Sequence, residues 1–212
     1  MKKLIATVVL LFVVSQASAG TWIGFGNYIP SSDTTYGILS ALTPRVVAIR
    51  WGTNFKVEPS ITVSYSGLSS NGYYSLGPID TFDISQTLLA FTVKGIVPVV
   101  DLQKLSFYGF GGIGFSYSSE KTTYQQTFGV YTKGDYDKES VLGFLIPFGV
   151  GLQVNLSNTV TLALDFESGL SFNKVSGEQK RGNTTTDLGS ANLFDVALQN
   201  QVLRFVLFFG IN

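Results

Sequence analysis

The chain has 212 residues, of which 45% are hydrophobic, 14% aromatic and only 13% charged, and it contains neither Cys nor His. This length suits one domain, and ordinary soluble domains carry about 25% charged residues. The 14 basic and 14 acidic residues balance, which speaks against a nucleic-acid partner. Without Cys and His there is no disulfide framework, no thiolate or imidazole metal site, and no Ser-His or Cys nucleophile. We therefore expect no enzyme, no cofactor and no metal.

The first residues have the pattern of an export signal. Lys2 and Lys3 precede an apolar run at 4–14, and Ala17-Ser18-Ala19 follows with the small-x-small spacing of a secretory cleavage site. We expect residues 1–19 to be a cleaved signal peptide and residues 20–212 to be the mature protein. The mature part offers no run of about 18 apolar residues for a membrane helix.

Beyond Gly20 the hydrophobic residues recur at every second position, which is the period of a strand with two different faces. The stretch 140–155 is the clearest example, with Leu142, Phe144 and Ile146 on one face and Gly149 and Gly151 on the other. Helical spacing does not fit these stretches, and their β-branched, aromatic and glycine content favours strands.

Turn signals divide the mature chain into eight such runs. We predict strands at 21–28, 46–55, 60–68, 82–97, 105–118, 140–155, 159–174 and 192–211. The connections alternate in length: tight turns at 56–59, 98–104 and 156–158, and longer polar loops at 29–45, 69–81, 119–139 and 175–191. Short turns at one end and long loops at the other are typical of an all-β, eight-stranded, antiparallel up-and-down transmembrane barrel.

The orientation of the two faces distinguishes a membrane barrel from a soluble, lipocalin-like binding barrel. One face carries large apolar side chains and the other carries Gly, Ser, Thr, Ala and a few charges. The interior of eight strands only just accommodates close-packed side chains. We therefore place the bulky set outside, where a membrane barrel presents an apolar band to lipid.

Three segments carry a resemblance to a known family: the Gly- and aromatic-rich stretch 107–115, the stretch 148–157, and the alternating strand 160–167 that ends in an acidic residue. They resemble the small eight-stranded outer-membrane barrels of the OmpA and OmpX type, with OmpW as a cousin. The resemblance implies a bacterial outer-membrane location, contact with outer-membrane lipid and lipopolysaccharide, and insertion by the outer-membrane assembly machinery. Such barrels usually end in an aromatic residue, whereas this chain ends in Asn212.

Gly109, Gly111 and Gly114 match the dinucleotide-binding pattern G-x-G-x-x-G. That motif requires a helix after the glycines to hold the pyrophosphate, whereas here strand alternation continues through Phe115 and Tyr117. We interpret the glycines as relief of crowding on the inner wall of a barrel.

A group of charged residues falls on the inner face of the predicted barrel. Asp165, Glu167 and Arg50 have inner parity, and Arg204 is expected to face inward too. Because buried charges need partners, we predict a salt-bridge cluster across the lumen, with Lys94 nearer the short-turn end. It could form a neutral plug in a packed interior, or a gate or ion-selective constriction.

The last predicted strand changes phase along its length. Phe194 has even parity with its apolar neighbours, whereas Leu203, Phe205 and Leu207 are odd. A bulge near Asn200-Gln201 would reconcile the two halves and keep Arg204 out of lipid.

The predicted loops are rich in tyrosines, which offer contact area together with a hydroxyl. The candidates for contact with an extracellular ligand are Tyr73, Tyr74, Tyr124, Tyr131 and Tyr136. Alternating acidic residues at Asp135, Asp137 and Glu139 lack the Gly and distal Glu of a calcium loop, so we interpret them as a solvated acidic segment.

These observations favour a non-enzymatic outer-membrane barrel that is structural or displays its four long loops for adhesion or interaction. An OmpW-like narrow passive channel for small or hydrophobic solutes is the alternative, and a soluble lipocalin-like barrel is less favoured. Relatives with enzymatic activity rely on sites that contain His, which is absent here.

Overall fold

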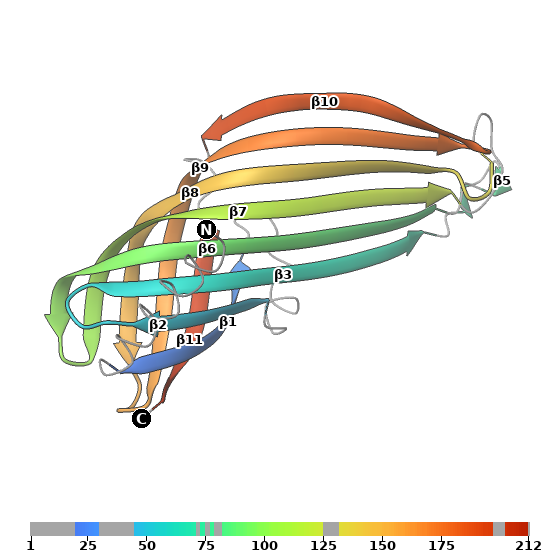
Figure 1. Ribbon diagram of the computed structural model, residues 1–212. Coiled ribbons are helices and arrows are strands. Elements are labelled where there is room, and N and C mark those ends of the chain that lie inside the picture. The colour runs from blue at the N-terminus through green and yellow to red at the C-terminus, as the bar shows by residue number, and fades with distance from the viewer. Residues whose placement is uncertain are drawn as a thin grey trace.

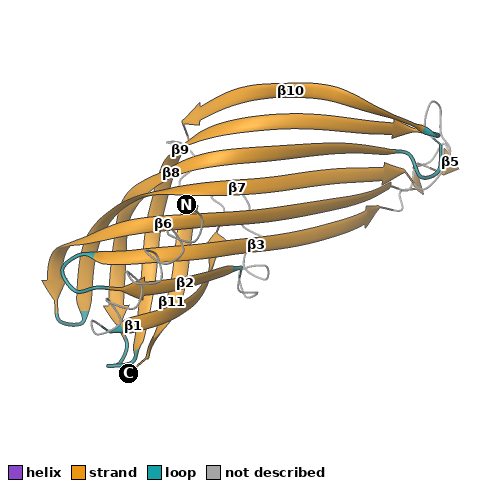
Figure 2. Cartoon of the chain, viewed as in Figure 1, coloured by secondary structure: helices purple, strands orange, loops and turns teal. Residues whose placement is uncertain are grey.

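The computed structural model describes residues 20–29, 45–70, 73–74, 77–78, 82–124, 132–196 and 202–211. The predicted signal peptide, residues 1–19, and the candidate contact residue Tyr131 lie outside the described residues. Regular structure in the described part is β-strand (Figure 2). None of the described residues belongs to a helix long and apolar enough to cross a membrane.

The strands follow one another in the chain as an antiparallel, up-and-down sheet, which confirms the predicted all-β, antiparallel, up-and-down class. Eight strands were predicted, whereas the main sheet of the described residues has nine, because the last predicted strand is divided in two. Their bounds are β1 (Thr21–Ile29), β2 (Val46–Trp51), β3 (Lys56–Ser70), β4 (Tyr73–Tyr74), β5 (Gly77–Pro78), β6 (Phe82–Leu102), β7 (Leu105–Tyr124), β8 (Tyr136–Asn155), β9 (Val160–Arg181), β10 (Thr184–Val196) and β11 (Val202–Ile211). The small pair β4–β5 stands apart from the main sheet.

The main sheet closes on itself because β9 has partners on both edges. β9 pairs with β8 on one side, and its first half pairs with β11 on the other. β11 then pairs with β1, which pairs with β2, so the ring of strands is complete (Figure 1). A closed ring leaves no unpaired backbone edge in contact with lipid, which is the condition for crossing a membrane with strands.

The strands are strongly staggered around the ring. Cross-strand partners lead from Leu162 on β9 through Leu207, Phe25, Val47, Ile61, Phe91, Phe115 and Phe144 to Phe172. The path thus returns to β9 ten residues further along, from Leu162 to Phe172. Such a stagger tilts the strands against the barrel axis, and the residues on the path form a continuous apolar row.

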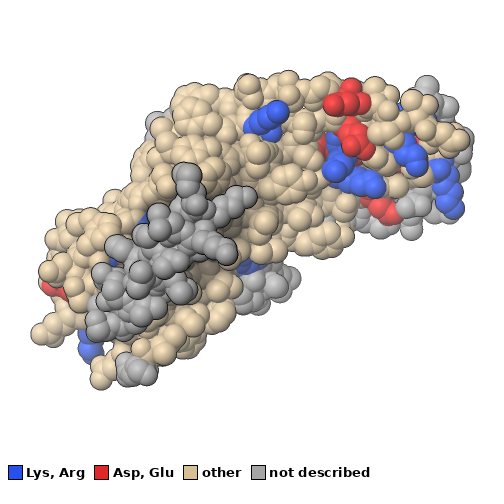
Figure 3. All heavy atoms as spheres, viewed as in Figure 1, with Lys and Arg blue, Asp and Glu red and all other residues tan. Residues whose placement is uncertain are grey.

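This row lies on the outside. Phe25 is 45% exposed, Ile61 48% and Phe115 57%. The opposite parity is buried and includes Ala48, Ala163 and Val206. Charged atoms are sparse over the middle of the face in Figure 3 and gather toward its two ends. The predicted assignment of the bulky face to the outside and the small face to the lumen therefore holds in the ring.

Large aromatic side chains nevertheless point into the lumen, among them Tyr108, Phe110 and Phe208, and glycines make room for them. A Cβ on Gly151 would lie 2.3 Å from the ring of Tyr108, and one on Gly149 would lie 2.9 Å from Phe110. The predicted role of the glycine motif holds only in part. Gly114 faces inward and is crowded by β6, whereas Gly111 faces outward with nothing within 4 Å of a Cβ. β7 continues to Tyr124, so the strand required for a barrel replaces the helix required for dinucleotide binding.

The end of the barrel opposite the short turns carries a sheet that protrudes beyond the ring. β1, β2 and β11 are short, whereas β3 and β6–β10 extend well beyond them (Figure 1). The protruding sheet consists of 63–70, 82–89, 117–124, 136–142, 170–181 and 184–196. Within the described residues, the loops predicted at 119–139 and 175–191 are strand at 119–124, 136–139, 175–181 and 184–191. In these segments polar residues occupy both faces of the strands. The sequence therefore shows no alternation of apolar residues from which strands could have been predicted.

The predicted strand 192–211 is divided into β10 and β11, which both pair with β9. Val196 is opposite Leu170 and Val202 is opposite Glu167, so six positions on one strand match three on the other. Three extra residues invert the parity, which places Phe194 and Phe205 on the same outer face. The phase change predicted near Asn200-Gln201 is therefore present, and residues 197–201 themselves lie outside the described part.

Candidate functional site

Six charged side chains meet inside the ring, and we call them the lumen cluster. They are Arg50 on β2, Glu58 on β3, Lys94 on β6, Asp165 and Glu167 on β9, and Arg204 on β11. Each occupies an inward position of its strand, and all except Glu167 are at most 3% exposed. Three basic and three acidic side chains make the cluster neutral.

Asp165 contacts two basic groups of the lumen cluster, Arg204 and Lys94. Its Oδ2 accepts hydrogen bonds from Arg204 Nη1 at 2.7 Å and from Lys94 Nζ at 3.2 Å. Its Oδ1 accepts a hydrogen bond from the hydroxyl of Tyr108. Lys94 also contacts Glu167 Oε2 at 2.5 Å. β6 and β9 are separated in the sheet by β7 and β8, so these contacts cross the lumen.

Glu58 continues the chain of charges toward β2. Its Oε1 lies 2.6 Å from Arg204 Nη1, and its Oε2 accepts a hydrogen bond from Arg50 Nε at 2.7 Å. The signs therefore alternate along Arg50, Glu58, Arg204, Asp165, Lys94 and Glu167. Because the signs alternate, every buried charge has a neighbour of opposite charge, which offsets the cost of removing it from water.

Aromatic rings cover this chain of charges. The guanidinium of Arg50 lies 4.3 Å from the ring centre of Phe208 and 5.4 Å from that of Tyr108. Lys94 Nζ lies 4.5 Å from the ring centre of Phe110. Cation–π contacts of this kind are strongest when the cation is desolvated, so the rings both fill the lumen and stabilise its cations.

The structure brings together all five charged residues predicted for the lumen and adds a sixth. Sequence reasoning missed Glu58 because Pro59 next to it suggested a turn at 56–59, whereas β3 begins at Lys56. The parity of Ser60 and Thr62 would have placed Glu58 inward. The predicted depth of Lys94 was wrong: Arg50 is nearest the short turns, where it bonds Gln153 at 3.1 Å.

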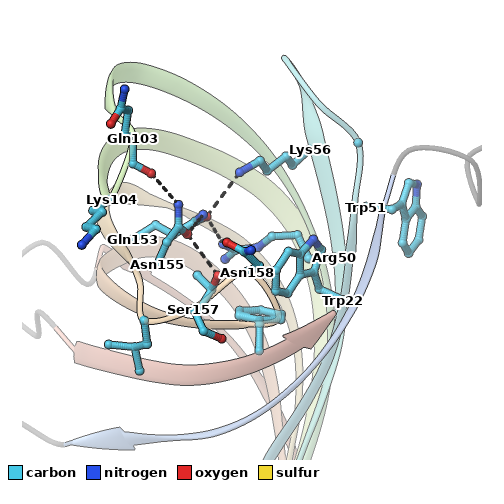
Figure 4. Close-up of a pocket in the computed structure, with 14 residues that line it drawn as sticks. Trp22, Arg50, Trp51, Lys56, Gln103, Lys104, Gln153, Asn155, Ser157 and Asn158 are labelled. Atoms are coloured by element: carbon cyan, nitrogen blue, oxygen red, sulfur yellow. Dashed lines mark hydrogen bonds between the residues drawn. The ribbon is translucent and has the colours of Figure 1, made fainter. Parts of the chain in front are cut away.

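A cavity of about 570 Å³ opens at the short-turn end, below the lumen cluster, and we call it the mouth (Figure 4). Arg50 forms part of its wall, together with Lys56 and Lys104, and Trp22 and Phe208 supply apolar surface. Arg50 and Lys56 both point toward the side-chain oxygen of Gln153 (Figure 4).

The predicted contact tyrosines are placed differently from the prediction. Tyr73 and Tyr74 form β4, and their side chains lie outside the described part. Tyr124 and Tyr136 belong to strands, and their hydroxyls are engaged: Tyr124 donates to Asp137 at 2.9 Å and Tyr136 donates to Glu178. The hydrogen bond to a carboxylate raises the pKa of Tyr136. These two residues therefore stiffen the protruding sheet.

Asp135 joins the ends of two hairpins. Its carboxylate accepts hydrogen bonds from the backbone N–H groups of Thr132 at 2.7 Å and Gly182 at 2.6 Å. The N–H of Thr132 and then that of Gly182 lower the pKa of Asp135, because they stabilise the ionised form. Asp137 pairs with Arg181 at 2.5 Å. Within the described residues, no group of three His, Cys, Asp or Glu side chains could hold a metal ion.

Comparison with known proteins bears on the fold. No family model matches the sequence, and no curated protein matches it. A major outer membrane protein from Thermus thermophilus is similar over 92% of this chain and 100% of its own, at 11% identity and a TM-score of 0.56. Ail, the attachment invasion locus protein of Yersinia pestis, aligns with 91% of this chain and 94% of its own, at 12% identity and a TM-score of 0.30. From the first of these similarities, the chain has the fold of an outer-membrane β-barrel.

Proposed function

We propose that this protein is a non-enzymatic barrel of the bacterial outer membrane, closed to ions, which displays its protruding sheet for interaction outside the cell. The observation that carries the proposal is the lumen cluster. Its alternating charges join strands on opposite sides of the ring, and five of its six side chains are at most 3% exposed. The exported, lipid-facing chain would contact outer-membrane lipid and lipopolysaccharide and be inserted by the assembly machinery.

A closed lumen has a direct electrical test. Refolded protein in a planar bilayer should give no steady conductance, because a permeating ion would have to displace buried ion pairs that cross the lumen. Heat-dependent mobility on a detergent gel verifies that the silent sample is folded. A steady unitary conductance from the folded protein would overturn the closed-lumen proposal and favour the narrow passive channel.

Display requires that the protruding sheet lies outside the cell and that the short turns lie in the periplasm. The chain contains no Cys, so a single introduced Cys gives an unambiguous label. Asn183 lies in the β9–β10 turn at the far end of the protruding sheet, and Asn158 lies in the short β8–β9 turn; both are exposed. A membrane-impermeant maleimide should label Asn183→Cys on intact cells and Asn158→Cys only after lysis. The reverse pattern would refute the orientation.

The protruding sheet suits contact with a partner because it is held rigidly and is rich in polar groups. Asp135 joins its hairpin ends, and Tyr124, Tyr136 and Arg181 bond across its strands. Rigid surfaces lose little conformational entropy on binding. Cells that express the protein should adhere to host-cell or matrix-coated surfaces more than cells without it.

A matched variant assigns that adherence to the sheet. Gly177 pairs with Gly189, so residues 178–188 can be replaced by a two-residue Asn-Gly turn, which favours a hairpin. The shortened protein should retain its heat-dependent mobility and lose adherence. If cells with the full-length protein adhere no better than cells without it, the display proposal fails.

A further inference from the structure

The mouth has an unusual charge distribution for a cavity in a protein whose acidic and basic residues balance. Arg50, Lys56 and Lys104 line it, and no Asp or Glu is among its lining residues. The remaining polar surface comes from neutral amides and hydroxyls such as Gln153, Asn155 and Thr161. Among the described residues, the cavity wall therefore carries basic side chains and no acidic one. Arg50 is paired with Glu58 behind the wall, so the excess positive charge comes from Lys56 and Lys104.

Two of the three cations converge on one neutral atom. Gln153 Oε1 accepts hydrogen bonds from Arg50 Nη1 at 3.1 Å and from Lys56 Nζ at 3.3 Å (Figure 4). The orientation of this amide is fixed, because its Nε2 donates to Asn155 Oδ1 at 3.0 Å and Asn155 donates to the Gln103 carbonyl at 2.9 Å. An amide oxygen carries only a partial charge, so it compensates two cations less well than an oxyanion does.

The carboxylates of the lumen cluster are already used. Glu58 contacts both Arg50 and Arg204, and the six cluster charges cancel, so Lys56 stands outside that balance. In the part of the chain that the structure describes, Lys56 has no salt bridge; Asp101, the acidic residue that acts on it electrostatically, accepts a hydrogen bond from Ser106 at 2.9 Å.

We propose that the mouth binds a small molecule bearing an oxyanion, a phosphate or a carboxylate, beside the Gln153 oxygen, where Lys56 and Arg50 converge. The volume of about 570 Å³ falls within the roughly 300–1,000 Å³ of small-molecule sites. Trp22 and Phe208 offer apolar surface to the rest of such a molecule. The site is at the opposite end of the barrel from the protruding sheet and does not depend on its function.

Intrinsic fluorescence provides the measurement, because both tryptophans of the chain, Trp22 and Trp51, line the mouth. Folded protein in a non-ionic detergent is titrated at constant ionic strength with inorganic phosphate in one series and with acetate in another. A saturable change is expected in at least one series, and the series with the tighter midpoint identifies the oxyanion class. No saturable change in either series would overturn the proposal.

Two variants and a control test the geometry. Lys56→Gln removes one direct charged donor and should weaken binding by about tenfold or more. Gln153→Glu places a carboxylate between the two cations, so it should fold at least as stably as the natural chain and abolish binding. Lys174→Gln makes the same change as Lys56→Gln at an exposed position on β9 and should leave the midpoint unchanged. Unweakened binding in Gln153→Glu, or equal weakening in both lysine variants, would refute the site.

Discussion

Glu58→Gln is the sharpest perturbation of the lumen cluster, because it removes one charge and preserves the size of the side chain. Glu58 is fully buried and is the acidic partner of both Arg50 and Arg204. The variant leaves the cluster with three basic and two acidic groups in the same buried space. Breaking a buried pair by removing one partner costs about 3–5 kcal/mol, and we expect the free energy of unfolding to fall by about that amount.

A double mutant separates charge balance from packing. Glu58→Gln combined with Arg50→Gln leaves Arg204 and Lys94 opposite Asp165 and Glu167, so the net charge of the cluster returns to zero. The double variant should therefore recover part of the stability, with a coupling of about 1–3 kcal/mol between the two sites. Urea unfolding in lipid vesicles, followed by tryptophan fluorescence and by the heat-dependent gel shift, measures each variant.

The control is the same change at an exposed position. Glu139 is exposed on β8, so Glu139→Gln should change the free energy of unfolding by less than about 0.5 kcal/mol. A loss of stability in Glu58→Gln as small as that in Glu139→Gln would refute the stabilising role of the buried Glu58. Additive effects of Glu58→Gln and Arg50→Gln would also refute it, because their ion pair would then contribute nothing to stability.

Three further changes test the packing and the protruding sheet. Gly151→Ala places a Cβ 2.3 Å from the Tyr108 ring and should cost about 1–3 kcal/mol; Gly111→Ala, with nothing within 4 Å, is its control, and equal effects would contradict the packing. The lowered pKa of Asp135 means that its stabilisation is present at neutral pH and is lost as the pH falls below the ordinary aspartate range. Protease cleavage at the hairpin ends should therefore rise on acidification in the natural chain and be high at every pH in Asp135→Ala; a pH-independent natural chain would contradict this. Tyr136 should ionise above pH 10, the usual value, in a spectrophotometric titration from which Tyr136→Phe identifies its signal; a normal midpoint would contradict its bond to Glu178.

The sequence was most informative where one face of a strand meets lipid and the other meets the lumen. In that region parity alone placed Arg50, Asp165 and Arg204 inside. A residue of such a strand faces either the lumen or lipid, and a charged side chain that faces lipid is costly. The same rule required a phase change before Arg204, and the offset between β10 and β11 on β9 supplies it.

Beyond the ring the rule loses its force. Both faces of the protruding sheet meet solvent, so 119–124 and 175–181 show no apolar period even though they are paired strand. The order of depth inside the lumen also escaped prediction, because strand tilt makes depth depend on the stagger and on all the intervening pairings. Arg50 is therefore nearer the short turns than Lys94, and its hydrogen bond to Gln153 marks that depth.

Under the closed-lumen proposal, an anion bound at the short-turn end should not pass through the barrel. An anion between Lys56 and Arg50 would meet Glu58 directly behind Arg50, and Asp165 behind Arg204. Each step inward brings the anion to a buried carboxylate, whose repulsion is strong in a poorly hydrated interior. A cation entering from the same side meets Lys56 and Arg50 first. If both proposals hold, the mouth is a blind pocket, and the combined prediction is a barrel that binds phosphate while it remains electrically silent.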